Sequence, residues 1–196
     1  MNNANAAPLV YRVTPSIHAR SAEQRAAILA GELGFGKHLA DHMVTIEWDS
    51  GRGWHDASVH AYGPLSLDPA AAVLHYGQEI FEGIKAYRHA DGSIWTFRPS
   101  ANGERLQRSA ARLALPLLPV GEFIESLRQL VAIDHEWVPS APESSLYFRP
   151  FMIATEAFLG VRAAQAAAYH VIASPAGAYF ANGVSPVSIW LSQDYA

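Results

Sequence analysis

The chain has 196 residues, half of them hydrophobic, and a formal net charge of −4 at pH 7. This length suits one domain, or one domain with part of a second, and the apolar content is sufficient for a buried core. No basic stripe points to nucleic acid, and no stretch resembles a membrane span or a signal peptide. The absence of cysteine excludes disulfides and thiolate metal sites and favours a cytoplasmic location.

The first half of the chain predicts one short helix and two hairpins. Residues 1–20 have the composition of a flexible polar tail. Ser21 and Gln24 match a capping box, so we expect a helix at about Ala22–Ala30. Alternating β-forming segments flank turns that contain glycine, and they predict hairpins at residues 42–48 with 54–62 and at residues 84–88 with 93–98.

The second half predicts two amphipathic helices and further strands. A helix opened by Pro99 covers about residues 101–113, and its cations Arg105, Arg108 and Arg112 share one face at spacings i, i+3 and i+7. The apolar stripe of a second helix is typical of a surface that faces the core. This helix is expected at residues 121–135, and strands are expected at residues 145–155, 167–173 and 184–191.

Together these elements predict an α+β fold. About six strands, mostly joined by hairpins, and two or three helices that follow strand pairs are typical of a largely antiparallel sheet with flanking helices. We expect a small α+β domain at residues 21–181 after the tail at residues 1–20. Residues 182–196 are expected to form a link and the first strand of a further domain.

Residues 74–88 are the first candidate for a functional site. They combine aromatic, acidic and basic side chains with two glycines, Gly77 and Gly83, which allow a turn or a close approach. Such a mixture of donors, acceptors and aromatic faces is typical of a pocket for a small molecule. The alternative is an ordinary helix-to-strand junction with a satisfied polar rim.

Arg149 is the second candidate. Tyr147, Arg149 and Phe151 alternate along one predicted strand, so their side chains share a face. An arginine on an apolar face is costly without a partner, which is either an internal carboxylate or an anionic substrate. Together with an arginine near a helix start, this set suits a small ligand that carries a carboxylate or a phosphate.

No metal site or hydrolase triad is expected. His38, Asp41 and His42 have an H-x-x-D-H spacing, but at the entry to a strand the two histidines need not converge. No cysteine or third histidine follows closely. His55 and His60 have opposite parity on their strand, so their side chains point apart.

The chain resembles the branched-chain amino acid aminotransferases, which are pyridoxal-phosphate enzymes of fold type IV. The resemblance spans roughly residues 33–191 and rests on several motifs in the same order. These motifs are Phe35-Gly36-Lys37 with Asp41-His42-Met43; Leu74-His75-Tyr76 with Phe81-Glu82-Gly83; Phe97-Arg98-Pro99 with Arg105 and Arg108-Ser109-Ala110; Ser145-Leu146-Tyr147-Phe148-Arg149-Pro150; Leu159-Gly160-Val161; and Pro175-Ala176-Gly177-Ala178-Tyr179-Phe180.

The resemblance implies an enzyme that moves the amino group of L-leucine, L-isoleucine or L-valine to 2-oxoglutarate through pyridoxal 5'-phosphate. Arg105 is then expected to hold the cofactor phosphate, since a guanidinium fork suits a phosphate. Arg149, helped by Tyr76, is expected to bind the distal carboxylate of glutamate. The pocket for the branched side chain is expected to be lined by Phe35, Tyr76, Phe81, Gly83, Tyr147 and Tyr179.

The resemblance also implies a homodimer, because Leu159-Gly160-Val161 is expected to reach the site of a neighbouring subunit. The Schiff-base lysine of the family belongs to a glycine-rich motif that is expected beyond Ala196, and neither Lys37 nor Lys85 matches it. Because a nucleophilic amine is indispensable, this chain alone is expected to be inactive, with residues 74–88 more exposed or less ordered than their motif requires. Lys85 is expected to play a supporting role near the pocket.

Three alternatives remain open at the level of sequence. Within the same fold, the chain could come from a D-amino acid aminotransferase or an aminodeoxychorismate lyase, although residues 81–83 and 145–150 fit the branched-chain group better. It could be a non-catalytic module for folding and dimerisation. It could also be a protein that binds carboxylates without chemistry.

Overall fold

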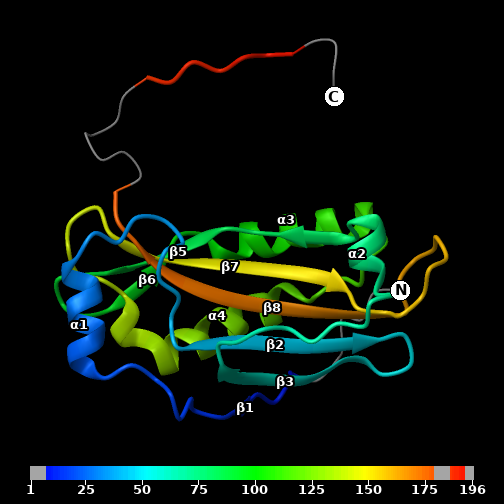
Figure 1. The fold of residues 1–196 in the computed structure, drawn as a ribbon, viewed down its shortest axis with the longest axis horizontal. Coiled ribbons are helices and arrows are strands. Elements are labelled where there is room, and N and C mark those ends of the chain that lie inside the picture. The colour runs from blue at the N-terminus through cyan, green and yellow to red at the C-terminus, as the bar shows by residue number, and fades with distance from the viewer. Residues whose placement is uncertain (1–7, 179–185, 193–196) are drawn as a thin grey trace.

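A computed structural model of the chain describes residues 8–178 and 186–192 (Figure 1). Its strands are β1 Arg12–Val13, β2 His42–Asp49, β3 Gly53–Ala61, β4 Glu79–Phe81, β5 Ile84–Arg88, β6 Ile94–Thr96, β7 Ser145–Ala154 and β8 Ala166–Ala176. They form one sheet in the order β1-β3-β2-β8-β7-β5-β6, and β4 pairs with β7 beside this path. Every pair is antiparallel except β1 with β3, which confirms the predicted α+β class.

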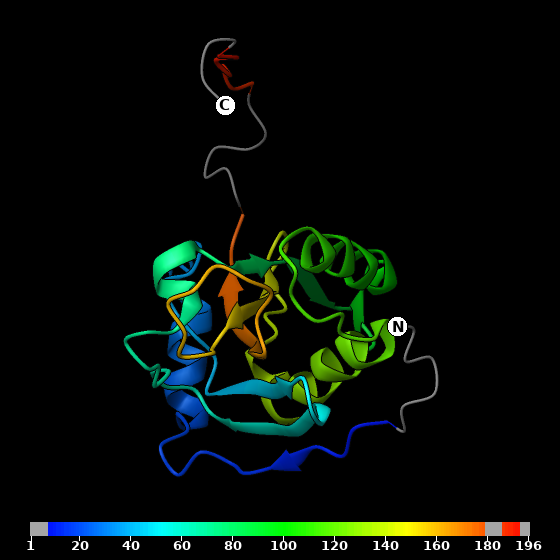
Figure 2. The same ribbon diagram turned by 90° about the vertical axis from the view of Figure 1, so that its right-hand side faces the viewer.

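The helices are α1 Ala22–Ala30, α2 Ala72–Tyr76, α3 Pro99–Arg112 and α4 Val120–Asp134, and a short 3-10 turn follows at His135–Trp137. Helices α3 and α4 lie together on one side of the curved sheet, and α1 lies on the other side (Figure 2). Ser21 caps α1 as predicted, because its side chain accepts from the Gln24 amide while the Gln24 side chain accepts from the Ser21 amide.

The core lies between α3, α4 and one face of the sheet. Helix α4 contributes Phe123, Leu127 and Leu130, and the even-numbered residues of β7, such as Phe148 and Met152, meet them. The strand period of two directs the odd-numbered residues of β7 to the opposite face. That second face, called the open face below, therefore presents Tyr147, Arg149 and Phe151, with Lys85 of β5 directly opposite Tyr147.

Two expectations about the ends of the chain differ from the structure. Residues 8–20 are held on the domain rather than loose, because β1 pairs with β3 and the Leu9 amide donates to Glu122 Oε1 at 3.1 Å. A strand of two residues has too short a pattern to be predicted. Within residues 186–192 no strand is present, although the sequence predicts one at 184–191. The described part of the chain has eight strands rather than about six, because β1 and β4 were not anticipated.

Candidate functional site

The open face carries a cluster built from β7, β4 and the loop before β2. The Arg149 guanidinium lies 4.4 Å from the centroid of the Phe81 ring and 5.5 Å from that of Tyr147. Its Nε and Nη2 both donate to Tyr147 Oη, at 3.1 and 3.0 Å. Phe35 completes the cluster edge-on to Tyr147, with 4.8 Å between ring centroids. Four residues predicted to bind substrate therefore lie together, with the cation over aromatic rings.

Gly83 is required by this cluster for a steric reason. A Cβ at this position would lie 2.5 Å from Tyr147 Oη and 3.1 Å from the ring. Glycine thus lets the phenol of Tyr147 pack directly against the backbone between β4 and β5. The sequence predicted either a turn or a close approach at Gly83, and the structure shows the close approach.

Arg105 is anchored by an acidic residue that sequence reasoning did not assign. Glu82 is only 3% exposed and accepts from Arg105 Nε and Nη2, each at 2.7 Å, so the two groups form a bidentate pair. Asn102 Nδ2 donates to Glu82 Oε2 at 2.9 Å and to the Gly83 carbonyl at 3.1 Å. Because Gly83 contacts both Asn102 and Tyr147, it links the Arg105 pair to the Arg149 cluster.

The charge state of Glu82 follows from these contacts. Burial by itself raises the pKa of the carboxyl group, but the hydrogen bonds from Arg105 and Asn102 outweigh it and hold the pKa below its usual value. Glu82 is therefore ionised at neutral pH and orients the guanidinium of Arg105. A sequence signal existed, since Asn102 and Arg105 are three residues apart on one helix face, but nothing in the sequence indicated Glu82 as their target.

Tyr76 points to a loop rather than to Arg149. Its hydroxyl donates to the Leu159 carbonyl, and this bond joins α2 to the segment after β7. Tyr76 was expected in the pocket of this chain and Leu159 in the site of a neighbouring subunit, so this contact within one chain tests neither assignment. No described contact joins Tyr76 to Arg149, so the expected help of Tyr76 in binding the distal carboxylate stays a prediction.

Two of the predicted positions cannot be compared with the structure. Tyr179, expected in the pocket lining, and Ala196, beyond which the Schiff-base lysine is expected, both lie outside the described residues. The lining role of Tyr179 and the position of the lysine motif therefore stay predictions.

The loop that contains Leu159 has an ordered base and an exposed tip. Arg162 Nη2 contacts Glu156 Oε1 at 2.5 Å, and the Arg162 guanidinium lies 4.3 Å from the centroid of the Phe158 ring. Val161 is 86% exposed and Leu159 is also exposed. The tip therefore presents aliphatic side chains to solvent from a base that is held by an ion pair.

A row of polar residues crosses the open face next to the Arg149 cluster. His60 Nδ1 donates to the Ala61 carbonyl, and Thr45 Oγ1 lies 2.9 Å from His60 Nε2 and 3.0 Å from His170 Nδ1. The His170 ring lies 5.0 Å from that of Phe151. Burial, followed by the effect of His60, lowers the pKa of His170 to about 4. His170 is thus neutral at physiological pH.

The histidines near β2 have structural partners. His42 Nδ1 lies 2.7 Å from Asp134 Oδ1, and its Nε2 accepts from the Ser16 amide at 2.8 Å. Asp41 pairs with Arg20 at 2.9 Å and accepts from the Trp137 indole. Residues 8–178 and 186–192 contain no group of three histidine or acidic residues that could hold a metal ion.

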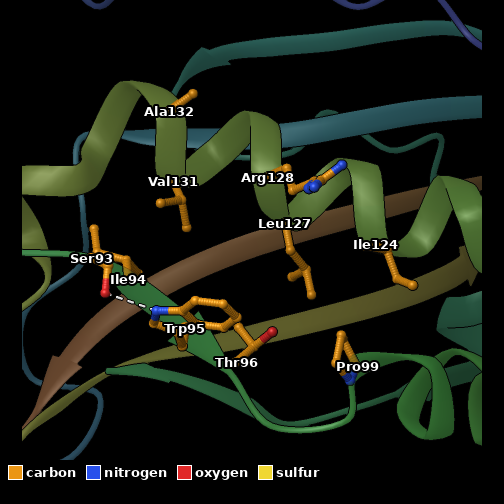
Figure 3. A pocket seen from close by; sticks show the side chains of 10 residues that line it. All are labelled: Ser93, Ile94, Trp95, Thr96, Pro99, Ile124, Leu127, Arg128, Val131 and Ala132. Atoms are coloured by element: carbon orange, nitrogen blue, oxygen red, sulfur yellow. Dashed lines mark hydrogen bonds between the residues drawn. The ribbon is translucent and has the colours of Figure 1, made fainter. Parts of the chain in front are cut away.

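A surface groove between β6 and α4 contains none of the predicted site residues (Figure 3). Its volume is about 760 Å³. Its polar groups are few, and the Trp95 indole already donates to Ser93 Oγ at 2.8 Å. The groove is therefore a weaker candidate than the open face, which combines a cation, hydroxyl groups and aromatic rings. Its lining residues are Ser93, Ile94, Trp95, Thr96, Pro99, Ile124, Leu127, Arg128, Val131 and Ala132.

In the described part of the chain, no helix has the length and hydropathy needed to cross a membrane.

No family model matches the sequence. The solved structure of the T.th. branched-chain amino acid aminotransferase, complexed with N-(5'-phosphopyridoxyl)-L-glutamate, has a related fold. The TM-score is 0.50 at 24% identity, over 66% of this chain and 39% of that chain.

Two curated relatives are much closer in sequence. Over 181 residues the chain is 62% identical to a probable branched-chain-amino-acid aminotransferase of Streptomyces coelicolor, and the match covers 92% of this chain and 50% of that protein. Over 192 residues it is 58% identical to the branched-chain-amino-acid aminotransferase of Mycolicibacterium smegmatis, with 97% of this chain and 52% of that protein covered. The chain spans about half the length of these relatives, and over that half it is similar to branched-chain-amino-acid aminotransferases.

Proposed function

We propose that this chain is the substrate-binding part of a transaminase that moves the amino group of L-leucine, L-isoleucine or L-valine to 2-oxoglutarate. The observation that supports this most directly is the half-buried guanidinium of Arg149. It lies among aromatic rings and contacts no carboxylate among the described residues. A substrate dicarboxylate supplies the missing anion, and a branched apolar side chain can pack on the same rings.

In this proposal each residue of the cluster has a physical task. Arg149 binds the distal carboxylate of glutamate, and Tyr147 holds the guanidinium in place through two hydrogen bonds. Phe35 and Phe81 exclude water and provide apolar surface. Gly83 makes room for Tyr147. Tyr76 and Tyr179 belong to the proposed lining.

Pyridoxal 5'-phosphate is the proposed cofactor, and when bound it supplies the electron sink for changes at the substrate α-carbon. The residues present fit its phosphate at Arg105. Glu82 orients this guanidinium through Nε and Nη2, yet the side chain remains 60% exposed and keeps donors for an anion. Lys37 is paired with Glu32 and Lys85 faces Tyr147. Neither matches the family's lysine motif, so neither is proposed as the Schiff-base lysine.

A homodimer is part of the proposal, with Leu159, Gly160 and Val161 reaching the neighbouring site. Exposed aliphatic side chains on an ordered loop support this assignment. We also propose a domain boundary between residues 181 and 182, and a cytoplasmic location. Light scattering tests the dimer: Val161→Asp is expected to lower the mass of the assembly, whereas Arg128→Gln on α4 is not. An unchanged mass with Val161→Asp would contradict the role of the loop.

Half-reactions of the full gene product test the role of Arg149. Arg149→Gln is expected to raise the KM for 2-oxoglutarate by about tenfold or more, because a charge-assisted contact is lost. The KM for L-leucine should change by less than about threefold, because its side chain carries no charge. Arg128→Gln is the matched control. Equal effects on both substrates would show that Arg149 does not bind the distal carboxylate.

A further inference from the structure

A groove between α3 and β4 collects three arginines, two of which have no task in the proposed reaction. Its volume is about 530 Å³, and Arg105, Arg108 and Arg112 line it together with Ile80, Ser109 and Leu113. The spacing i, i+3, i+7 places the three cations along one side of α3. The three cations thus line one side of a shallow, open groove, called the cationic wall below.

The charges along this wall are compensated unevenly. Arg105 has Glu82 as its bidentate partner. Within the described residues, neither Arg108 nor Arg112 forms an ion pair or a side-chain hydrogen bond. Glu104 is one turn before Arg108 on the same helix, but the two do not pair either. The groove therefore keeps two positive charges that the described residues leave uncompensated.

A purely structural role accounts for Arg112 but not for Arg108. Arg112 is in the last turn of α3, where a cation interacts favourably with the carbonyl end of the helix. Arg108 is a full turn earlier, and like charges three or four residues apart destabilise a helix. An anion in the groove would relieve this repulsion at Arg108.

The lining also suits a particular class of anion. A guanidinium fork matches the oxygens of a phosphate, and the Ser109 hydroxyl is a further donor beside Arg108. Ile80 and Leu113 provide an apolar floor, on which a nonpolar part of an organic phosphate can pack. Guanidinium, hydroxyl and apolar floor are thus combined in one groove.

We propose that the α3–β4 groove is a second anion site, which binds a phosphate dianion through Arg108 and Ser109, with Arg112 as a supporting cation. The ligand is inorganic phosphate or the phosphate of a monoester. The site adjoins Arg105, but it does not depend on the cofactor role proposed for that residue. Its occupation neutralises the cations that α3 presents.

Calorimetric titration of the 196-residue chain with inorganic phosphate at low ionic strength tests the site. Arg108→Gln is expected to weaken phosphate binding by about tenfold, since one charge-assisted contact is lost. Arg112→Gln is expected to have a smaller effect. Arg128→Gln is the matched control, because Arg128 is a 76% exposed helical arginine outside the groove. Circular dichroism of each variant establishes that it is folded.

A second titration separates the groove from the proposed cofactor site. Pyridoxine 5'-phosphate and pyridoxine differ by the phosphate, and neither has an aldehyde that reacts with lysine. Binding of the phosphate ester that is weakened by Arg108→Gln supports the groove. Binding that responds to Arg105→Gln alone supports the proposed cofactor site and overturns the groove. The proposed groove site is also overturned if no phosphate binds at millimolar concentration. The same holds if all variants, including Arg128→Gln, lose phosphate affinity equally.

Discussion

The two faces of strand β7 differ, because one packs into the core and the other carries the proposed binding cluster. Its even-numbered residues, such as Phe148, are fully buried against the helices, whereas Tyr147 and Arg149 on the other face are only half-buried. The side chains on the core face pack against other residues of the same chain. The open face keeps an arginine without a carboxylate partner among the described residues. A charged residue that lacks a partner in this way is a candidate for contact with a ligand.

Truncating a large side chain on each face tests the comparison most strongly. Phe148→Ala is expected to lower the free energy of unfolding by about 3–5 kcal/mol, because it leaves a cavity in a closed core. Phe81→Ala on the open face should cost less than about 1 kcal/mol, since its ring is 62% exposed. Urea denaturation measures both values. Equal losses in the free energy of unfolding would mean that the open face stabilises the sheet as much as the core face does.

The dependence of stability on pH probes the polar row on the open face. The pKa of His170 is lowered from its ordinary 6.5 to about 4 in the folded chain, so the unfolded chain binds more protons between these values. His170 should therefore contribute stability that is present above pH 6.5 and is lost as the pH falls towards 4. The loss amounts to roughly 3 kcal/mol.

Urea denaturation between pH 4 and 7 measures this contribution. His170→Gln should flatten the dependence over this range, because the titrating group is removed. An unchanged slope in the variant would show that other groups cause the loss of stability. Burial also raises the pKa of the Asp134 carboxyl group, and Asp134→Asn is the control that separates its contribution from that of His170.

A side chain added at Gly83 is expected to change the free energy of unfolding by less than protonation of His170 does. Gly83→Ala is expected to cost about 1–2 kcal/mol, because its Cβ would displace Tyr147, which Phe35 and Arg149 hold in place. Gly121→Ala on α4 is the matched control. It meets no atom within 4 Å and should stabilise the chain by about 0.5–1 kcal/mol. A neutral Gly83→Ala would show that Tyr147 moves freely.

The smallest expected effect comes from the Tyr147 hydroxyl. Tyr147→Phe removes the acceptor of two hydrogen bonds from Arg149. Solvent can replace that acceptor at a half-buried site, so the expected loss is below about 1 kcal/mol. Thermal unfolding measures it, with Tyr87→Phe on β5 as the control. A loss as large as that of Phe148→Ala would remove the distinction between the two faces.

Sequence reasoning predicted the local structure well and the partners of charged residues poorly. The capping box, both hairpins and the two long helices follow from patterns within a few residues, and the structure confirms them. The pairing of Arg105 with Glu82 was not predicted, because 23 residues separate them and no local pattern encodes the contact. For the same reason the packing of residues 8–20 on the domain was not expected.

The sequence by itself determined the α+β class and the alternation that places Tyr147 and Arg149 on one face, because side-chain direction has a period of two in any strand. Only the tertiary structure decided what meets that face. The strand register sets Lys85 opposite Tyr147, and the fold brings Phe35 onto the Tyr147 ring. Such contacts depend on packing between distant segments, which a local pattern does not specify.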